Sequence, residues 1–279
     1  MHKQKGIFFS SRRLRRLLYA KSARAARGRF CLQPSPQMPK PYDPLVLTWR
    51  AAYMQRIADC VRLGYCRWIS GEVPLERAPA FMQKFAALYR VDASRGQRLR
   101  LRRAGLGAAR LLLYAPKSEG EQRAAKVIWV LLVSDGEHPA AGLEKLRDAR
   151  APGERIRVGG YELLQLPRKG SGKPAWTWRM PSEKYQGWRE RVIQAARKPW
   201  LGAEADIIKG LYGIPGFAGA RSQVGYLVSL WRREWKRRRA ATEPFPKLPQ
   251  LRYVQRLKNL GVPLSQLARE EDRPSGASQ

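Results

Sequence analysis

The stretch Lys126–Asp135, KVIWVLLVSD, constrains the fold of this chain more than any other. It is an almost unbroken apolar run, rich in β-branched residues. The polar segment KSEGEQR precedes it, and Ser134-Asp135-Gly136 follows it. A short apolar run between turn signals is typical of a strand that is buried on both faces. We therefore predict that this stretch is the central strand of a sheet.

Strand-like and helical periods alternate around this run. The predicted strands are 65–73, 95–103, 109–115, 126–135, 155–166 and 175–180, and the predicted helices are 45–63, 74–89, 138–148 and 181–197. Gly159-Gly160 predicts a bulge or bend within its strand. The order β-α-β-β-α-β, with one extra hairpin strand, is that of a ferredoxin-like fold. We expect an α+β protein with a ferredoxin-like antiparallel sheet, helices on one face, and a helical C-terminal lobe.

Shifts in composition divide the chain into four parts. Residues 1–44 form a basic arm and a proline-rich linker, and 45–198 form the α+β core. Residues 199–270 form a helical basic lobe, and 271–279 a disordered tail. Within the lobe, the helical period predicts a long helix over Ala220–Ala240 and one or two short helices over Leu251–Glu270.

The charge balance indicates the class of partner. The chain has 55 basic and 22 acidic residues, a formal net charge of +33. A domain this basic is expected to bind a polyanion, by default nucleic acid, with an anionic membrane surface as the alternative. No apolar run reaches the roughly 18 residues of a transmembrane helix, so we predict no membrane-spanning segment. Of the two kinds of partner, we expect nucleic acid and no membrane. Three irregularly spaced cysteines predict reduced thiols in the cytoplasm.

Arginine and lysine clusters are the predicted nucleic-acid-binding sites. They comprise an acid-free N-terminal segment, one face of the strand 95–103, the turn 168–173, and the second half of the helix 220–240. Such side chains neutralise phosphates. The predicted residues are Arg12, Arg13, Arg15, Arg16, Arg98, Arg100, Arg102, Arg103, Arg168, Lys169, Lys173, Arg232, Arg233, Lys236, Arg237, Arg238 and Arg239.

Three of these four segments have an alternative interpretation. The arm could be an organellar transit peptide or a solvated helix, and the turn 168–173 could be a solvated turn. Trp231 and Trp235 lie among the arginines of the long helix. Exposed aromatic side chains stack on unpaired bases. Spaced four residues apart, these two could equally form the core face of that helix.

The sequence predicts no catalytic residue, no metal and no cofactor. His138 follows Ser134 and Asp135, but residues adjacent along one loop do not define a catalytic triad. We expect Ser134 or Asp135 to cap the next helix. A metal-independent nuclease that uses His138 or Tyr185 is the enzymatic alternative.

Two stretches resemble known families. WVLLVSDGEHP resembles the W-x-L-L-V-x-D-G strand of phage and plasmid replication-initiation proteins, without the metal-binding histidines of that family. GYELLQL, PAWTWRM and GIPGFAGARSQV resemble uncharacterised basic proteins of bacterial plasmids and integrative elements. That resemblance implies a mobile-element protein that binds nucleic acid during replication or transfer, and it supplies no catalytic residue that could be transferred to this chain.

The runner-up interpretation also comes from a resemblance. RAMP-type CRISPR RNA-processing proteins share the predicted ferredoxin-like order. This implies an RNA-binding subunit or processing endonuclease, with other protein subunits of a nucleoprotein complex as partners. Phosphate contacts do not distinguish DNA from RNA, so both remain open.

Overall fold

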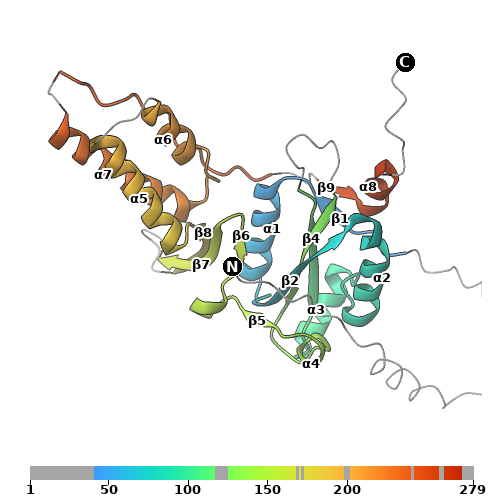
Figure 1. The fold of residues 1–279 in the computed structure, drawn as a ribbon. Coiled ribbons are helices and arrows are strands. Elements are labelled where there is room, and N and C mark those ends of the chain that lie inside the picture. Colours follow the sequence, from blue (N-terminus) through green and yellow to red (C-terminus); the bar gives the residue numbers. More distant parts are fainter. Residues whose placement is uncertain are drawn as a thin grey trace, which may run out of the picture. The chain divides into compact units, whose positions relative to one another are not determined.

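The computed structural model describes residues 41–116, 125–167, 170, 173–197, 202–239, 242–257 and 261–271. Its strands form a six-stranded main sheet of order β5-β2-β4-β3-β1-β9 and a three-stranded small sheet of order β6-β7-β8 (Figure 1). The main-sheet strands are β1 (Leu45–Leu47), β2 (Arg67–Pro74), β3 (Ala109–Tyr114), β4 (Lys126–Val133), β5 (Arg147–Asp148) and β9 (Gly261–Pro263). The small-sheet strands are β6 (Arg157–Val158), β7 (Tyr161–Pro167) and β8 (Pro174–Arg179).

Helices connect and cover these strands. The α-helices are α1 (Arg50–Arg62), α2 (Ala78–Tyr89), α3 (Arg95–Arg103), α4 (Ala140–Leu143), α5 (Ser182–Arg197), α6 (Ala203–Tyr212), α7 (Ala218–Arg238) and α8 (Leu264–Glu271). Two short 3₁₀ turns are η1 (Leu75–Arg77) and η2 (Pro152–Glu154). The α+β class is confirmed.

The apolar run forms β4, an interior strand of the main sheet, as predicted. It pairs antiparallel with β2 on one side and β3 on the other. Trp129 and Leu131 belong to the same hydrophobic cluster as α2, whereas Val130 and Leu132 belong to the cluster that contains α1. Successive side chains of a strand point to opposite faces. Helices therefore cover both faces of the main sheet, and the prediction of helices on one face is wrong.

The ferredoxin-like order is not confirmed. The predicted last strands, β7 and β8, lie in the small sheet, and β1 pairs parallel with β3. Gly159 and Gly160 have φ angles of 56° and 75°. They form a two-residue turn, because Val158 pairs with Tyr161 across them. The predicted bulge is thus a hairpin, for which glycine is suited by its access to positive φ.

The arginine-rich segment 95–103 is the helix α3 rather than a strand. A capping box begins it: the Gln97 backbone N–H donates to Ser94 Oγ at 3.2 Å, and the Ser94 N–H donates to Gln97 Oε1 at 2.6 Å. The Arg–Leu alternation favours a strand on period alone. The segment is helical because the capping box satisfies two backbone donors at the helix start. A strand would need alternate side chains to be buried, and α3 has no buried residue.

Three further predicted helices differ from the observed elements. Residues 45–63 divide into β1 and α1, and 138–148 contain a single helical turn, α4, before β5. Of the one or two short helices predicted over Leu251–Glu270, the described residues contain one, α8. Residues 242–257 hold no helix or strand, and we call them the strap. Gln255 O accepts from Gln55 Nε2 at 2.5 Å, and Arg256 pairs with Asp59 at 2.9 Å, so the end of the strap lies against α1.

After the strap, the chain returns to the main sheet. β9 pairs antiparallel with β1, and α8 contacts α2. Asp43 accepts from the Ser265 backbone N–H at 2.9 Å and from its hydroxyl at 2.6 Å, at the start of α8. The final residues of the predicted helical lobe thus complete the sheet of the core.

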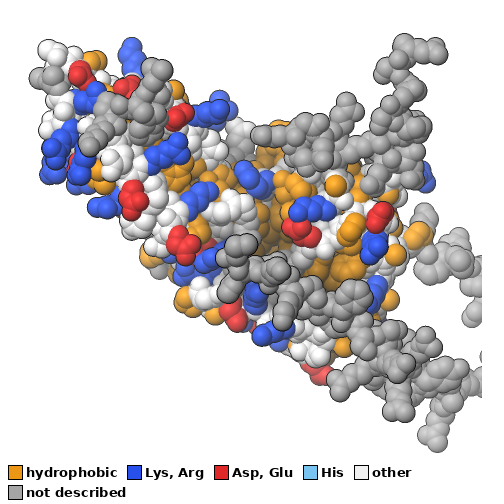
Figure 2. Space-filling view, viewed as in Figure 1, with side chains coloured by type: hydrophobic (Ala, Val, Ile, Leu, Met, Phe, Trp, Pro, Cys, Tyr) orange, Lys and Arg blue, Asp and Glu red, His pale blue; other side chains and the backbone are white. Residues whose placement is uncertain are grey.

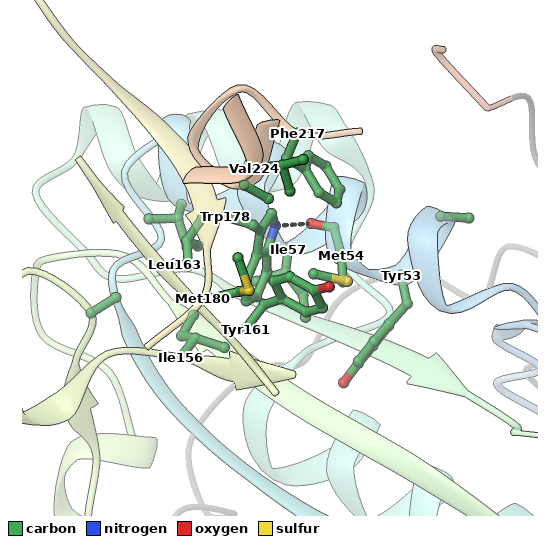
Figure 3. Close-up of a cluster of buried hydrophobic side chains, with 14 of the residues drawn as sticks. Tyr53, Met54, Ile57, Ile156, Tyr161, Leu163, Trp178, Met180, Phe217 and Val224 are labelled. Carbon is green, nitrogen blue, oxygen red and sulfur yellow. Dashed lines mark hydrogen bonds between the residues drawn. The ribbon is translucent and has the colours of Figure 1, made fainter. Parts of the chain in front are cut away.

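Trp178 of β8 lies at the centre of the cluster that joins the small sheet to α1. Its side chain is fully buried, and Leu163 and Val224 of the same cluster are fully buried too (Figure 3). Its indole Nε1–H donates to the carbonyl oxygen of Met54 in α1 at 3.0 Å. A buried indole needs such a partner. The bond therefore fixes how β8 lies against α1.

We predict that Trp178→Phe lowers the free energy of unfolding by about 1–3 kcal/mol, because it removes buried ring atoms and the bond to Met54. Trp176, on the same strand but only half-buried, is the matched control. Trp176→Phe should cost less than about 1 kcal/mol. Urea unfolding followed by circular dichroism measures both. Equal losses in the two variants would show that the bond to Met54 has no special role.

Candidate nucleic-acid interface

The first half of α7 anchors this helix in the core, as predicted. Val224, Leu227 and Trp231 are fully buried, and Trp235 is 4% exposed. Trp231 and Trp235 meet the ring of Phe245 edge-to-face, with centroid distances of 5.0 and 5.7 Å. The two tryptophans form the core face of α7. They are therefore not available to stack on bases.

The second half of α7 carries a basic surface. Arg233, Lys236 and Arg238 are exposed, and within the described part of the chain none of them forms an ion pair. Arg232 is also exposed, and its guanidinium lies over the ring of Phe245 at 5.0 Å. Figure 2 shows lysine and arginine side chains gathered at this end of α7. Like charges so close together repel one another, and a polyanion would relieve that repulsion.

Two predicted members of this cluster have structural contacts instead. Arg239 pairs with Glu243 at 2.7 Å and lies over the ring of Trp235 at 4.4 Å, with its side chain only 17% exposed. Arg237 lies 3.5 Å from the buried carboxylate of Glu234, which Arg197 of α5 also contacts at 3.1 Å. Arg239 therefore supports the packing of the last turn of α7. The charge of Arg237 is partly balanced by the carboxylate of Glu234.

The second basic surface is α3. None of its predicted residues Arg98, Arg100, Arg102 and Arg103 forms an ion pair with a described carboxylate. Arg102 lies over the ring of Tyr65 at 5.4 Å, and Arg98 donates to the carbonyl oxygen of Ala93. Because α3 is a helix, these side chains spread around its axis rather than lining one face of a strand.

Of the remaining predicted residues, the structure describes only Lys173, which lies on neither α3 nor α7. Lys173 is exposed directly before β8. Arg12, Arg13, Arg15, Arg16, Arg168 and Lys169 lie outside the described residues. Helix α7 packs on α5 and β8, whereas α3 precedes β3 of the main sheet, so the two basic surfaces are separate (Figure 1).

An exposed aromatic residue near the α7 cluster was missed in the sequence. Tyr226 is 68% exposed and lies on α7 about two turns before Arg233, on the same side of the helix. The spacing of seven residues was a usable signal. Trp231 and Trp235 are the stronger aromatic signal in the sequence, because they are larger and lie inside the arginine run.

His138 has a structural role in this arrangement. Its Nδ1 accepts from the backbone N–H of Ala140 at 3.2 Å, so Nε2 carries the proton, and Nε2 lies 3.3 Å from the carbonyl oxygen of Tyr89. Burial is the main cause that lowers the pKa of His138. His138 thus binds the first N–H of α4. Ser134 and Asp135, the predicted caps, instead contact Ala108 and Arg150.

Other kinds of site find no support in the described residues. No three side chains of His, Cys, Asp or Glu gather there in a way that could hold a metal ion. None of the described helices has the length and apolar character needed to cross a membrane. Comparisons of the chain with protein-family models, with curated proteins and with solved structures gave no match.

The lowered pKa of His138 predicts a pH effect on stability. The folded protein keeps this ring neutral, while in the unfolded chain it takes up a proton below about pH 6.5. Its stabilising contribution is therefore complete above that pH and decreases as the pH falls below it. In a His2→Gln background, His138→Gln should lower stability near neutral pH but reduce the further loss toward about pH 5. Urea unfolding at both pH values tests this, and an unchanged pH dependence would contradict it.

Proposed function

We propose that this protein binds nucleic acid through the phosphate backbone. The observation that carries the proposal is the set of exposed arginine and lysine side chains on α3 and at the end of α7 that have no carboxylate partner among the described residues. Phosphate groups would supply the missing counter-charge and release bound ions. The net charge of +33 points to the same class of partner.

The exposed ring of Tyr226 adds a stacking surface beside the α7 cluster. Stacking on an aromatic ring is open to any base, and it requires unpaired nucleotides. Together with the backbone contacts, this favours a single strand bound without sequence preference. In line with the resemblances in the sequence, we place the activity in the replication or transfer of a mobile element in the cytoplasm, on DNA or RNA, with other protein subunits as possible partners.

The alternative, an RNA-binding subunit or processing endonuclease of a RAMP-like ribonucleoprotein, depends on a ferredoxin-like order. The strand order of the main sheet gives it no support. The nuclease version assigned catalysis to His138 or Tyr185, and the His138 ring is held by two backbone groups. We therefore retain non-enzymatic binding as the proposal.

We predict that the triple variant Arg233→Ala, Lys236→Ala and Arg238→Ala weakens binding most at low salt. Three lost phosphate contacts should reduce the slope of log K against log salt by about 2 for a single strand, from about 0.7 per contact. Fluorescence anisotropy with a labelled oligonucleotide at several salt concentrations measures this. The fold should be unaffected, because all three side chains are exposed and lie outside the core.

A matched control removes the same charge elsewhere. Lys84, Lys145 and Arg157 are exposed and lie outside both basic surfaces. Their replacement by Ala should change the slope far less. If both triple variants change it equally, the effect comes from net charge rather than from a surface on α7.

Arg239→Ala should behave differently from the triple variant. It removes a largely buried guanidinium from the ring of Trp235 and from Glu243. We expect a loss of about 1–2 kcal/mol in the free energy of unfolding, measured with urea, and little change in the salt slope. A large slope change with unaltered stability would place Arg239 among the phosphate contacts.

A further inference from the structure

A cavity of about 690 Å³ lies beside the end of β4, where the chain leaves the main sheet. The ends of α2 and α3 and the loops on either side of Gly107 and Gly136 form its walls. A Cβ atom on Gly136 would lie only 2.5 Å from the carbonyl oxygen of Gly105, so these loops pack backbone to backbone. Its volume is that of a small-molecule site.

The charged groups of the cavity wall are predominantly positive. Arg67, Arg90 and Arg98 line it, against one carboxylate, Glu137, and the neutral ring of His138. Arg90 and Arg98 form no ion pair with any described residue. The Arg67 guanidinium donates from Nη2 to the carbonyl oxygen of Gly136 at 2.7 Å, and the carboxylate it pairs with is Asp135, at 3.9 Å. That carboxylate is already bound by Arg150, at 3.0 Å to each oxygen, so the cavity retains an excess of positive charge.

Arg90 occupies a strained backbone position at the edge of this cavity. Its φ and ψ are 53° and 40°, in the left-handed region, at the C-cap of α2. It is the one non-glycine residue of the described ranges with positive φ. Glycine is the usual residue at such a helix end, because a side chain there is unfavourable. Strain of this kind is found at functional positions, and here the strained residue is one of those that line the cavity.

The rest of the wall is apolar. Leu88 of α2, Leu101 of α3 and Leu106 of the following loop contribute to it, together with Pro139. A site for inorganic phosphate alone would not need this volume or these side chains. Positive charge combined with an apolar wall suits a ligand that carries a phosphate on a flat apolar body, as a nucleotide does.

We infer that this cavity binds a nucleotide through its terminal phosphate, with the base against the leucines. A terminal phosphomonoester carries a charge of about −1.5 to −2 at neutral pH, more than an internal phosphodiester. A terminal phosphate therefore balances the excess positive charge of the arginines better than an internal phosphodiester does. The inference rests on the proposed function for one source of this ligand, the phosphorylated end of a bound strand; the other source is a free mononucleotide.

Helix α3 connects the cavity to the proposed nucleic-acid surface. Arg98 and Leu101 of α3 line the cavity, while Arg100 and Arg103 of the same helix are exposed outside it. A strand whose backbone follows the exposed arginines would bring its end to the cavity. The site would then distinguish phosphorylated ends from hydroxyl ends, which the backbone contacts alone do not.

The experiment compares strand ends on the full-length protein. Internally labelled oligonucleotides of one sequence carry a 5′-phosphate, a 3′-phosphate or hydroxyl groups at both ends, and AMP and adenosine serve as competitors. We expect the oligonucleotide with a phosphate at one of the two ends, 5′ or 3′, to bind about tenfold more tightly than the oligonucleotide with two hydroxyl ends. That is the gain of a charge-assisted contact. AMP should remove this difference, and adenosine should not.

Arg90→Gly is the decisive variant. It removes the guanidinium and relieves the left-handed backbone, so the melting temperature should be unchanged or higher while the preference for a phosphorylated end is lost. Arg90→Asn is a second such variant, because asparagine tolerates this conformation. Arg100→Ala, outside the cavity, is the control. It should weaken binding of all the oligonucleotides equally and keep the preference.

The outcomes separate the two proposals. Strand binding without an end preference, and without competition by AMP, would overturn the cavity assignment and leave the proposed function intact. Direct binding of AMP that Arg90→Gly abolishes, with no binding of any oligonucleotide, would support the cavity as a free-nucleotide site and overturn the proposed function. Failure of all probes to bind would overturn both.

Discussion

The position of the small sheet and of α5, α6 and α7 depends on the packing around α1. One side of α1 covers the main sheet, with Tyr53 stacked on Tyr114 of β3. Its Met54 carbonyl receives the indole N–H of Trp178, and the cluster around Trp178 continues through the small sheet into α5, α6 and α7. One continuous core therefore contains both sheets. The place of the basic end of α7 follows from that core, because α7 is anchored in it by Val224 and Leu227.

Which parts of the fold could be predicted depends on whether contacts near in sequence or far apart in sequence determine them. The strand Lys126–Val133 and the helix α7 were predictable, because hydrophobic period over many residues determines them. Two sheets in place of one could not be predicted, since this depends on which strands pair at long range. The helix α3 was misassigned although its signal was local: the capping box at Ser94 and Gln97 is readable in the sequence, and the Arg–Leu alternation obscured it.

The sequence predicted which segments of the candidate site are basic, but not which of their side chains are exposed. The sequence identified the arginine runs, yet it could not separate the exposed Arg233 and Arg238 from Arg239, which is held by Trp235 and Glu243. The cavity was hidden altogether, because Arg67, Arg90 and Arg98 come from three different elements. The left-handed backbone of Arg90 has no sequence signature, since nothing in the chain marks an arginine where glycine is expected.

The pairing of β9 with β1 has a consequence for how this chain is made. Asp43 and Ser265, which join these ends, are 222 residues apart in the sequence. During synthesis β1 is made long before β9, so one side of β1 stays unpaired until almost the entire described chain has been made. Contacts of such long range slow folding, and an unpaired strand invites pairing with another molecule. A nascent chain of this protein therefore depends on β9 to cover the side of β1 that β3 leaves unpaired.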